Sequence, residues 1–323
     1  MTQAGAARLC TAAPERNHEQ AFVLMPSLPF PIYGAFAVLT LALAAVWAPR
    51  VSASTRAGLF WTVPGAVAAV LGLAGGLIDV GALFVLLFLA GACAVARRAG
   101  GRAIAVAAHV MMFAACAGLF LHVVPGVDNP RVISAEVLGP GSVPYTKYLN
   151  FDKGMAGLFL LGIYASDQPA ADEGLRHAVA FLWRFAIVVT VVMALSLAVG
   201  EVRWDPKLPP WWAVWTWSMV FLTALPEEAL FRGVGQSLIT KGLGGTDRAA
   251  TMAIVIAGVL FGLAHLAGGP TAVALAAAAG LGYGWIYLST RSIGAAIAAH
   301  AGLNAIHLLF FSYPGLRPFS VWV

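Results

Sequence analysis

The sequence predicts an all-α, polytopic transmembrane helix bundle with about eight to ten membrane helices. Of its 323 residues, 60% are hydrophobic and 10% are charged, and the mean hydropathy is +0.85, whereas soluble domains carry roughly 25% charged residues. Most apolar runs have the ~17–25 residues needed to span a ~30 Å hydrocarbon layer. The net charge of +5 comes from lysines and arginines scattered between these runs, as in the loops of membrane proteins. We therefore expect an integral membrane protein of a bacterial inner membrane, in contact with membrane lipid and without a nucleic-acid partner.

Apolar runs give the expected helices in chain order, at residues 32–49, 57–75, 77–96, 103–124, 154–166, 178–200, 211–240, 249–267, 271–289 and 292–312. The run at 154–166 is short, and we expect it to be only half-inserted. The run at 211–240 is long, and Pro226 should kink or restart this helix because proline lacks the amide donor. The longest loop, 125–153, mixes acidic and basic residues and is expected outside the membrane.

One segment of the seventh run, Leu225–Gly233, is unusual because it carries two adjacent carboxylates and an arginine. A charge near the middle of a bilayer costs at least ~2.5–3.5 kcal/mol, so such residues are candidates for function. Glu228 and Arg232 are four residues apart and share a helix face, whereas Glu227 lies ~100° away and is free of that pairing. The segment is either a structural ion pair joining two helices, or an active carboxylate, Glu227, beside a structural pair.

Two later runs carry histidines. His265 follows Phe261 by four residues near the end of its run, and His300 and Asn304 share one face of the last run. Alone, His265 fits a capping or interfacial residue, and the His300–Asn304 pair fits an ordinary interhelical hydrogen bond. Together with Glu227 they supply a base, a proton shuttle and hydrogen-bond donors for an oxyanion. These groups are the parts needed to hydrolyse an amide with activated water.

These three motifs, in this order on successive apolar runs, resemble the CPBP family. The motifs are Glu-Glu-x-x-x-Arg, Phe-x-x-x-His and His-x-x-x-Asn, and the resemblance covers about residues 211–311. The family comprises type II CAAX-processing endopeptidases and bacteriocin-processing proteins. The resemblance implies an intramembrane endopeptidase that hydrolyses a peptide bond of a membrane-anchored peptide or protein.

The resemblance also implies a role for each motif residue. Glu227 would be the general base that activates water, and His265 would help to hold that water. His300 and Asn304 would stabilise the oxyanion of the tetrahedral intermediate. Three supporting residues would fix the helices that carry this site, namely Glu228, Arg232 and Phe261. The loops that collect Lys and Arg are expected on the cytoplasmic side. Counted from these loops, Glu227, His265 and His300 lie at unequal depths of ~21, ~25 and ~13 Å, so a shared site requires tilted or broken helices.

A metal ion is the open alternative for this chemistry. Glu227, His265 and His300 have the donor types of a two-histidine, one-glutamate zinc set, as in a metalloendopeptidase. However, the sequence has no His-Glu-x-x-His motif, and the three ligands would come from separate helices. We therefore favour a mechanism without a cofactor over a zinc mechanism. The three cysteines show no paired spacing, so they predict neither a disulfide framework nor a cysteine metal site.

We expect four parts along the chain. Residues 1–30 form a polar tail, which is not translated if synthesis starts at Met25. Residues 31–200 form a variable transmembrane scaffold, residues 201–312 form the CPBP-type catalytic bundle, and residues 313–323 form a short tail. The alternative to an enzyme is a non-enzymatic membrane scaffold or bacteriocin-immunity-type protein, in which the polar cluster serves helix association.

Several other polar and aromatic residues are predicted to be structural. His109 and His122 are 13 residues apart, so they should lie on different faces of one helix and form no site. His307 is expected in a structural or interfacial role. Five tryptophans are expected to form an interfacial aromatic belt, namely Trp204, Trp211, Trp212, Trp215 and Trp217.

Overall fold

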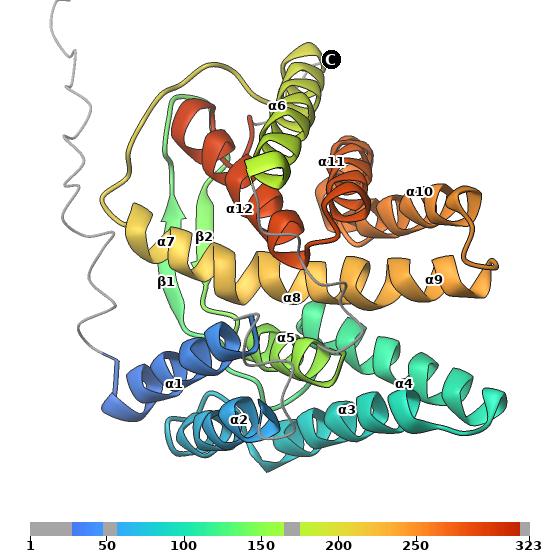
Figure 1. The fold of residues 1–323 in the computed structure, drawn as a ribbon. Coiled ribbons are helices and arrows are strands. Elements are labelled where there is room, and N and C mark those ends of the chain that lie inside the picture. The colour runs from blue at the N-terminus through green and yellow to red at the C-terminus, as the bar shows by residue number, and fades with distance from the viewer. Residues whose placement is uncertain (1–27, 48–56, 165–174, 317–323) are drawn as a thin grey trace, which may run out of the picture.

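The computed structural model describes residues 28–47, 57–164 and 175–316 (Figure 1). This part of the chain is a helix bundle with one small sheet of two strands, which confirms the predicted fold class. The expectations for the polar tail and for a start at Met25 lie outside the described residues, as does Cys10. Five described helical segments are long and apolar enough to cross a membrane, namely Val80–Arg98, Arg102–Phe120, His177–Ala198, Leu266–Thr290 and Ile293–Phe310.

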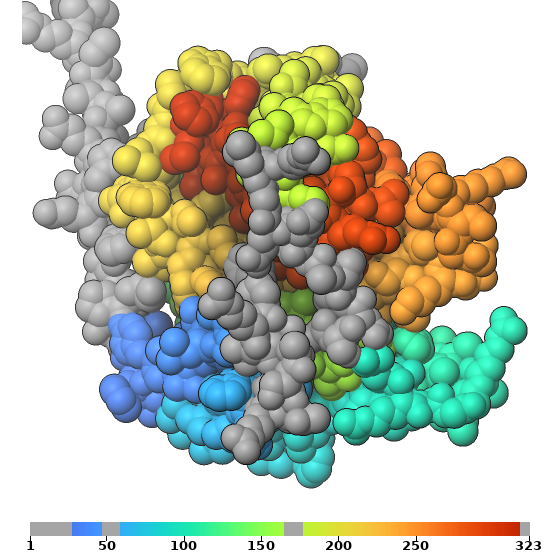
Figure 2. Space-filling model, viewed as in Figure 1, coloured from blue at the N-terminus to red at the C-terminus, as the bar shows by residue number. Residues whose placement is uncertain are grey.

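The helices form where the apolar runs predict them. The first four are α1 (Phe30–Trp47), α2 (Ala57–Ala74), α3 (Val80–Arg98) and α4 (Arg102–Phe120). The later ones are α5 (Phe151–Tyr164), α6 (Leu175–Ala198), α10 (Asp247–Leu263), α11 (Gly269–Thr290) and α12 (Ile293–Phe310), with a short 3₁₀ turn, η6 (Leu266–Gly268), before α11. The seventh run forms one long helix that crosses the molecule. Figures 1 and 2 show α1–α4 on one side of this helix, and α6, α10, α11 and α12 on the other.

The long helix continues through Pro226, so the predicted restart is wrong. It consists of α7 (Trp212–Met219), η4 (Val220–Ala224), α8 (Leu225–Glu228), η5 (Ala229–Gln236) and α9 (Ser237–Gly242). The segments η4 and η5 are π-helical, and the amide of Leu225 donates to the carbonyl of Val220, five residues back. These wider turns on both sides of Pro226 let the backbone absorb the missing amide donor without breaking. Glu227 and Glu228 therefore lie between two π-helical segments, where such turns are frequent at functional sites.

The short fifth run is an enclosed central helix, and its half-insertion in the membrane stays a prediction. Most residues of α5 are buried, because α1–α4 pack around it on one side and the long helix packs on the other. Gly157 allows a close approach of α5 to the long helix, since a Cβ at this position would lie 2.9 Å from the Cβ of Pro226. This short helix therefore fills the interior of the bundle.

The loop before α5 contains a β-hairpin that the sequence did not predict. Strand β1 (Arg131–Glu136) pairs antiparallel with β2 (Tyr145–Tyr148), with Arg131 opposite Tyr148. Two register shifts interrupt the ladder. Strand β2 buries alternate residues but one of them is Lys147, and β1 does not alternate, so neither strand shows an alternation of apolar and polar residues in the sequence. The sequence pattern of residues 125–153 therefore predicted a loop instead of two strands.

Two tryptophans of the expected aromatic belt instead anchor this hairpin. The Nε1 atom of Trp211 donates to a carboxylate oxygen of Glu136 at 2.8 Å, and that of Trp215 donates to the hydroxyl of Tyr145 at 2.9 Å. Both indoles are buried, so the belt prediction is wrong for them. Trp204 remains exposed. The hairpin is thereby fixed against the start of the long helix.

Candidate functional site

The predicted ion pair of the Glu-Glu-x-x-x-Arg motif is present and is completely buried. The Nη1 atom of Arg232 donates to Oε1 of Glu228 at 2.9 Å, and neither side chain is exposed to solvent. The Nη2 atom of Arg232 donates to the carbonyl of Gly280 in α11 at 2.8 Å. One turn later, Gln236 donates to the carbonyl of Gly284 at 3.2 Å. The two polar side chains of η5 therefore bind the backbone of α11 on successive turns.

His300 joins this pair from α12. Its Nδ1 atom lies 2.8 Å from the same Oε1 of Glu228 that Arg232 binds. Because a carboxylate only accepts hydrogen bonds, Nδ1 carries the proton and Nε2 is left for another partner. The ring stacks on Tyr283, with centroids 4.9 Å apart and an angle of 15° between the planes. Residues from α8, η5, α11 and α12 thus meet in one buried cluster.

Phe261 lies between the two histidines of the motifs. Its ring centroid is 4.9 Å from that of His265 and 5.5 Å from that of His300. The guanidinium of Arg232 lies 4.7 Å from the same ring centroid on another side. Phe261 is buried, so this ring sets the spacing of the two imidazoles and also contacts the Glu228–Arg232 pair.

His265 lies just after α10 and remains exposed, as expected for a residue that can meet substrate or water. Its Nδ1 atom lies 2.8 Å from the carbonyl oxygen of Phe261. Since a carbonyl oxygen only accepts, Nδ1 carries the proton, and the neutral ring keeps a lone pair on Nε2. His265 is therefore oriented by its own helix end, with Nε2 available as an acceptor.

Asn304 lies one turn after His300 on α12, as the spacing predicts. Its Nδ2 atom donates to the backbone carbonyl of His300 at 3.1 Å, which leaves a second Nδ2 hydrogen for another acceptor. His307, on the same helix, lies 3.1 Å from the backbone carbonyl of Ser312 through its Nε2 atom and packs on Tyr313. This contact holds the chain that follows α12, in keeping with the structural role expected for His307.

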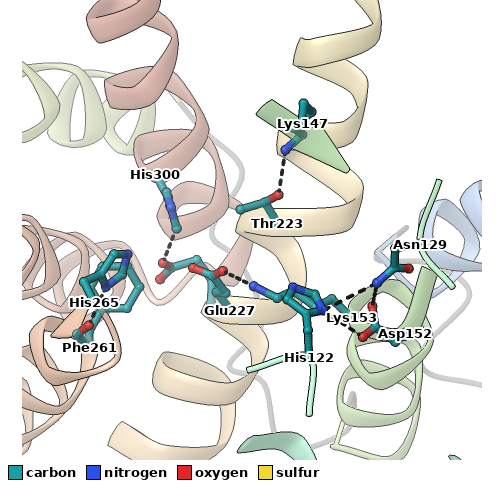
Figure 3. A network of polar contacts seen from close by, with 11 residues as sticks. His122, Asn129, Lys147, Asp152, Lys153, Thr223, Glu227, Phe261, His265 and His300 are labelled. Carbon is teal, nitrogen blue, oxygen red and sulfur yellow. Dashed lines mark hydrogen bonds and ion pairs between the residues drawn. The ribbon is translucent and has the colours of Figure 1, made fainter. Parts of the chain in front are cut away.

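Glu227 points away from the Glu228–Arg232 pair, as predicted, and it has a partner that the sequence did not reveal. The Nζ atom of Lys153, in the first turn of α5, donates to Oε1 of Glu227 at 3.2 Å (Figure 3). Both side chains are 12% exposed, so the carboxylate is nearly enclosed but still accessible. Glu227 also interacts electrostatically with His300 and His265. The carboxylate thus lies between a lysine from the first half of the chain and two histidines from the second.

A second lysine of the first half reaches the same helix one turn earlier. Lys147, on β2, is buried, and its Nζ atom donates to the hydroxyl of Thr223 at 3.3 Å. The pKa of Lys147 is lowered to about 8, chiefly by burial and also by the nearby Lys153 cation, while the Glu227 carboxylate acts in the opposite direction. Both lysines belong to regular elements, β2 and α5, instead of the predicted loop, and the expectation that residues 125–153 lie on the external side stays a prediction.

A buried hydrogen-bond network fixes the start of α5. Oδ2 of Asp152 lies 3.1 Å from Nδ1 of His122, and Oδ1 accepts a hydrogen bond from Asn129 at 2.9 Å. The side-chain oxygen of Asn129 in turn accepts from the amide of Phe151 at 2.8 Å. His122 follows the end of α4 at Phe120 and has a φ of 55°, so it does not share a helix with His109 as predicted. One sign of this network was present in the sequence, since two charged residues, Asp152 and Lys153, stand directly before an apolar run that is too short to span a membrane.

The expected zinc set does not assemble in this structure. Among the described residues, no group of three or more histidine, cysteine, aspartate or glutamate side chains is arranged to hold a metal ion. Each candidate ligand has a protein partner, since Glu227 binds Lys153, His265 binds the Phe261 carbonyl and His300 binds Glu228. In the described part of the structure the three side chains are not grouped as a zinc ligand set, and no step below uses a metal ion.

Comparison with known proteins identifies one family in the part of the chain that holds these motifs. Residues 209–306 match the sequence profile of the family described as type II CAAX prenyl endopeptidase Rce1-like. Comparison with curated proteins and with solved structures yields no significant match. The five apolar helices and the family match together indicate an integral membrane protein. The match confirms the family resemblance predicted from the motifs, and it indicates a membrane protease of the CAAX type.

Proposed function

We propose that this chain is an intramembrane endopeptidase that cleaves a membrane-anchored peptide or protein with water activated by Glu227. The observation that carries this proposal is the position of Glu227, a nearly enclosed carboxylate within electrostatic reach of His265 and His300. A general base must be ionised, reachable by water and held in place. Glu227 meets these conditions, whereas Glu228 is fully buried and is bound by Arg232 and His300.

The proposed reaction divides proton transfer and charge stabilisation among the motif residues. Glu227 takes a proton from water, and the resulting hydroxide attacks the scissile carbonyl carbon. Nε2 of His265 accepts a hydrogen bond from this water, because its Nδ1 proton is held by the Phe261 carbonyl. The proton on Glu227 then passes to the leaving amine as the carbon–nitrogen bond breaks. The products are a carboxylic acid and an amine, which become a carboxylate and an ammonium ion by proton transfer, so one water is consumed for each bond cleaved.

His300 and Asn304 are proposed to stabilise the oxyanion of the tetrahedral intermediate. His300 presents Nε2 to the oxyanion, since Nδ1 is already bound to Glu228, and it donates there when Nε2 carries a proton. Asn304 has one amide hydrogen left after its bond to the His300 carbonyl. Donors that are fixed before the reaction stabilise developing charge without reorganising, and one such donor is typically worth about 10²–10³ in rate.

The test is proteolysis of a membrane-anchored peptide library by the purified protein in lipid nanodiscs, with cleavage products identified by mass spectrometry. We expect Glu227→Gln to lower the rate by about 10²–10⁴, the usual contribution of a general base. The matched control is Glu136→Gln, which changes a carboxylate of the hairpin but keeps an oxygen for Trp211 to bind. This control should cleave at the wild-type rate.

Each result of this assay has a distinct consequence. Cleavage that depends on Glu227 and survives a chelator supports the mechanism without a metal. Cleavage that is lost on chelation and restored by zinc would support a metalloendopeptidase instead. Unchanged cleavage by Glu227→Gln would refute Glu227 as the base. If the wild-type protein cleaves no library member, the result would favour the non-enzymatic scaffold, in which the polar cluster serves helix association.

A further inference from the structure

Two lysines from the first half of the chain contact one face of the helix that carries Glu227. Thr223 and Glu227 are four residues apart, so they lie on successive turns of this helix. Lys147 of β2 binds Thr223, and Lys153 of α5 binds Glu227 (Figure 3). Both lysines lie outside residues 209–306, which match the family profile. The candidate site is therefore completed by a part of the chain that the family match does not cover.

The charges around Glu227 show what Lys153 contributes. The helix carries two adjacent carboxylates, and Arg232 binds only Glu228. A carboxylate taken out of water without a counter-charge tends to take up a proton, and a protonated acid cannot act as a base. Within the described part of the chain, Lys153 is the hydrogen-bond partner of the Glu227 carboxylate. Its ammonium binds Oε1, and this contact leaves Oε2 unengaged by Lys153.

The position of Lys153 is fixed independently of this ion pair. The neighbouring Asp152 is fully buried and binds Asn129 and His122, which holds the first turn of α5. The Lys153 ammonium also lies 5.3 Å from the ring centroid of Phe120 at the end of α4. Loss of the Lys153 charge therefore leaves α5 in place, so an effect on the reaction can be separated from an effect on folding.

We propose that Lys153 is a positioning residue for the candidate base, because its ammonium holds the Glu227 carboxylate ionised and directs Oε2 toward the attacking water. This inference rests on the proposed function and extends it to the first half of the chain. It assigns to α5 a part in the reaction, in addition to its place in the core. In the opposite role Lys153 would act as a latch, that is, its ion pair would block Glu227, and the test below distinguishes the two roles.

The kinetic test compares Lys153→Met and Lys153→Arg with the wild-type protein, on a peptide that the wild type cleaves. We expect Lys153→Met to lower kcat at least about tenfold with little change in KM, since the cation acts on the base and not on substrate binding. Lys153→Arg keeps the charge and should restore most of the rate. Lys241→Met is the matched control, because Lys241 is an exposed lysine in the last turn of α9, away from Glu227, and we expect less than about a threefold change.

A thermal unfolding cycle tests the contact without any substrate. Lys153→Met and Glu227→Gln should each lower the Tm, whereas the double variant should lose clearly less than the sum of the two, because residues in contact are coupled. Additive losses of Tm would mean that the two side chains do not interact, and would overturn the inference. The cycle can therefore overturn the inference even where no substrate has been found, and the kinetic test separates the positioning role from a latch.

The two proposals fail in different ways. If Glu227→Gln retains full activity, the proposed function is wrong, whatever Lys153 does. If Glu227→Gln is inactive and Lys153→Met cleaves at the wild-type rate or faster, the proposed function stands and the positioning role is refuted. Rates above wild type in Lys153→Met would identify the ion pair as a latch. A rate that falls in Lys153→Met and stays equally low in Lys153→Arg would also contradict a role based on charge.

Discussion

The buried Lys147 should destabilise this protein at neutral pH, and replacing it with methionine should therefore stabilise the fold. Burial lowers the pKa of Lys147 from 10.5 to about 8, a difference of about 2.5 pH units. At 1.36 kcal/mol per unit, this difference corresponds to about 3 kcal/mol of cost to the folded state. Methionine has a similar length and no charge, so Lys147→Met should recover most of this free energy at pH 7.

The sign and the pH range follow from the same two pKa values. Below pH 8 both the folded and the unfolded state hold the proton, and the cost is complete. Between pH 8 and 10.5 the folded protein has released the proton while the unfolded chain still holds it, so the stability of the wild type rises with pH. By this linkage, the advantage of Lys147→Met should fall from about 3 kcal/mol at pH 7 to roughly half of that at pH 9.5.

The assay is thermal unfolding of the wild type and Lys147→Met in the same detergent, at pH 7 and at pH 9.5. The control is Lys241→Met, which removes an exposed lysine from the last turn of α9 and should give no pH-dependent difference in Tm. An equal Tm difference at both pH values, or a lower Tm for Lys147→Met at pH 7, would refute the reasoning. Such a result would mean that Lys147 is better compensated than its single bond to Thr223 indicates.

Two further predictions concern packing around the site. Arg232→Leu should destabilise the fold by about 3–5 kcal/mol, because it leaves the buried Glu228 without its cation. Chemical unfolding measures the loss of stability. A loss below about 1 kcal/mol would contradict the prediction. Gly157→Ala should cost about 1–3 kcal/mol, since its Cβ would lie 2.9 Å from that of Pro226. The matched control is Gly91→Ala in α3, where no atom lies within 4 Å of the added Cβ, and equal Tm values for the two alanine variants would disprove the close-approach argument.

The helices and the ion pair of the motif were predictable because both depend on local spacing. Long apolar runs have few alternatives to helices in a membrane, and each predicted run contains a helix in the structure. The Glu228–Arg232 pair follows from four-residue spacing on one helix. The contact between Glu228 and His300 joins residues 72 positions apart. The motif resemblance anticipated this grouping, which spacing alone does not give.

The enclosed helix and the hairpin were not predictable from hydrophobic runs, because their environment is set by the rest of the bundle. The length of α5 suggested partial insertion in the membrane and gave no sign that other helices surround it. The hairpin was not predicted, because its strands are short and irregularly paired and do not alternate apolar and polar residues. Trp211 and Trp215 looked interfacial, whereas their indole amides bind hairpin residues. In each case a tertiary contact reversed the meaning of a local pattern.

The charge balance of the seventh run carried a signal about the first half of the chain. Glu227 and Glu228 are two carboxylates in an apolar segment with one cation, Arg232, in reach on the same helix. Because an unpaired buried charge costs several kcal/mol, a second cation has to come from another element. The lysine that lies directly before the short fifth run is that cation, at 3.2 Å from Glu227. The first half of the chain is thus more than a variable scaffold, since α5 brings Lys153 to the candidate base.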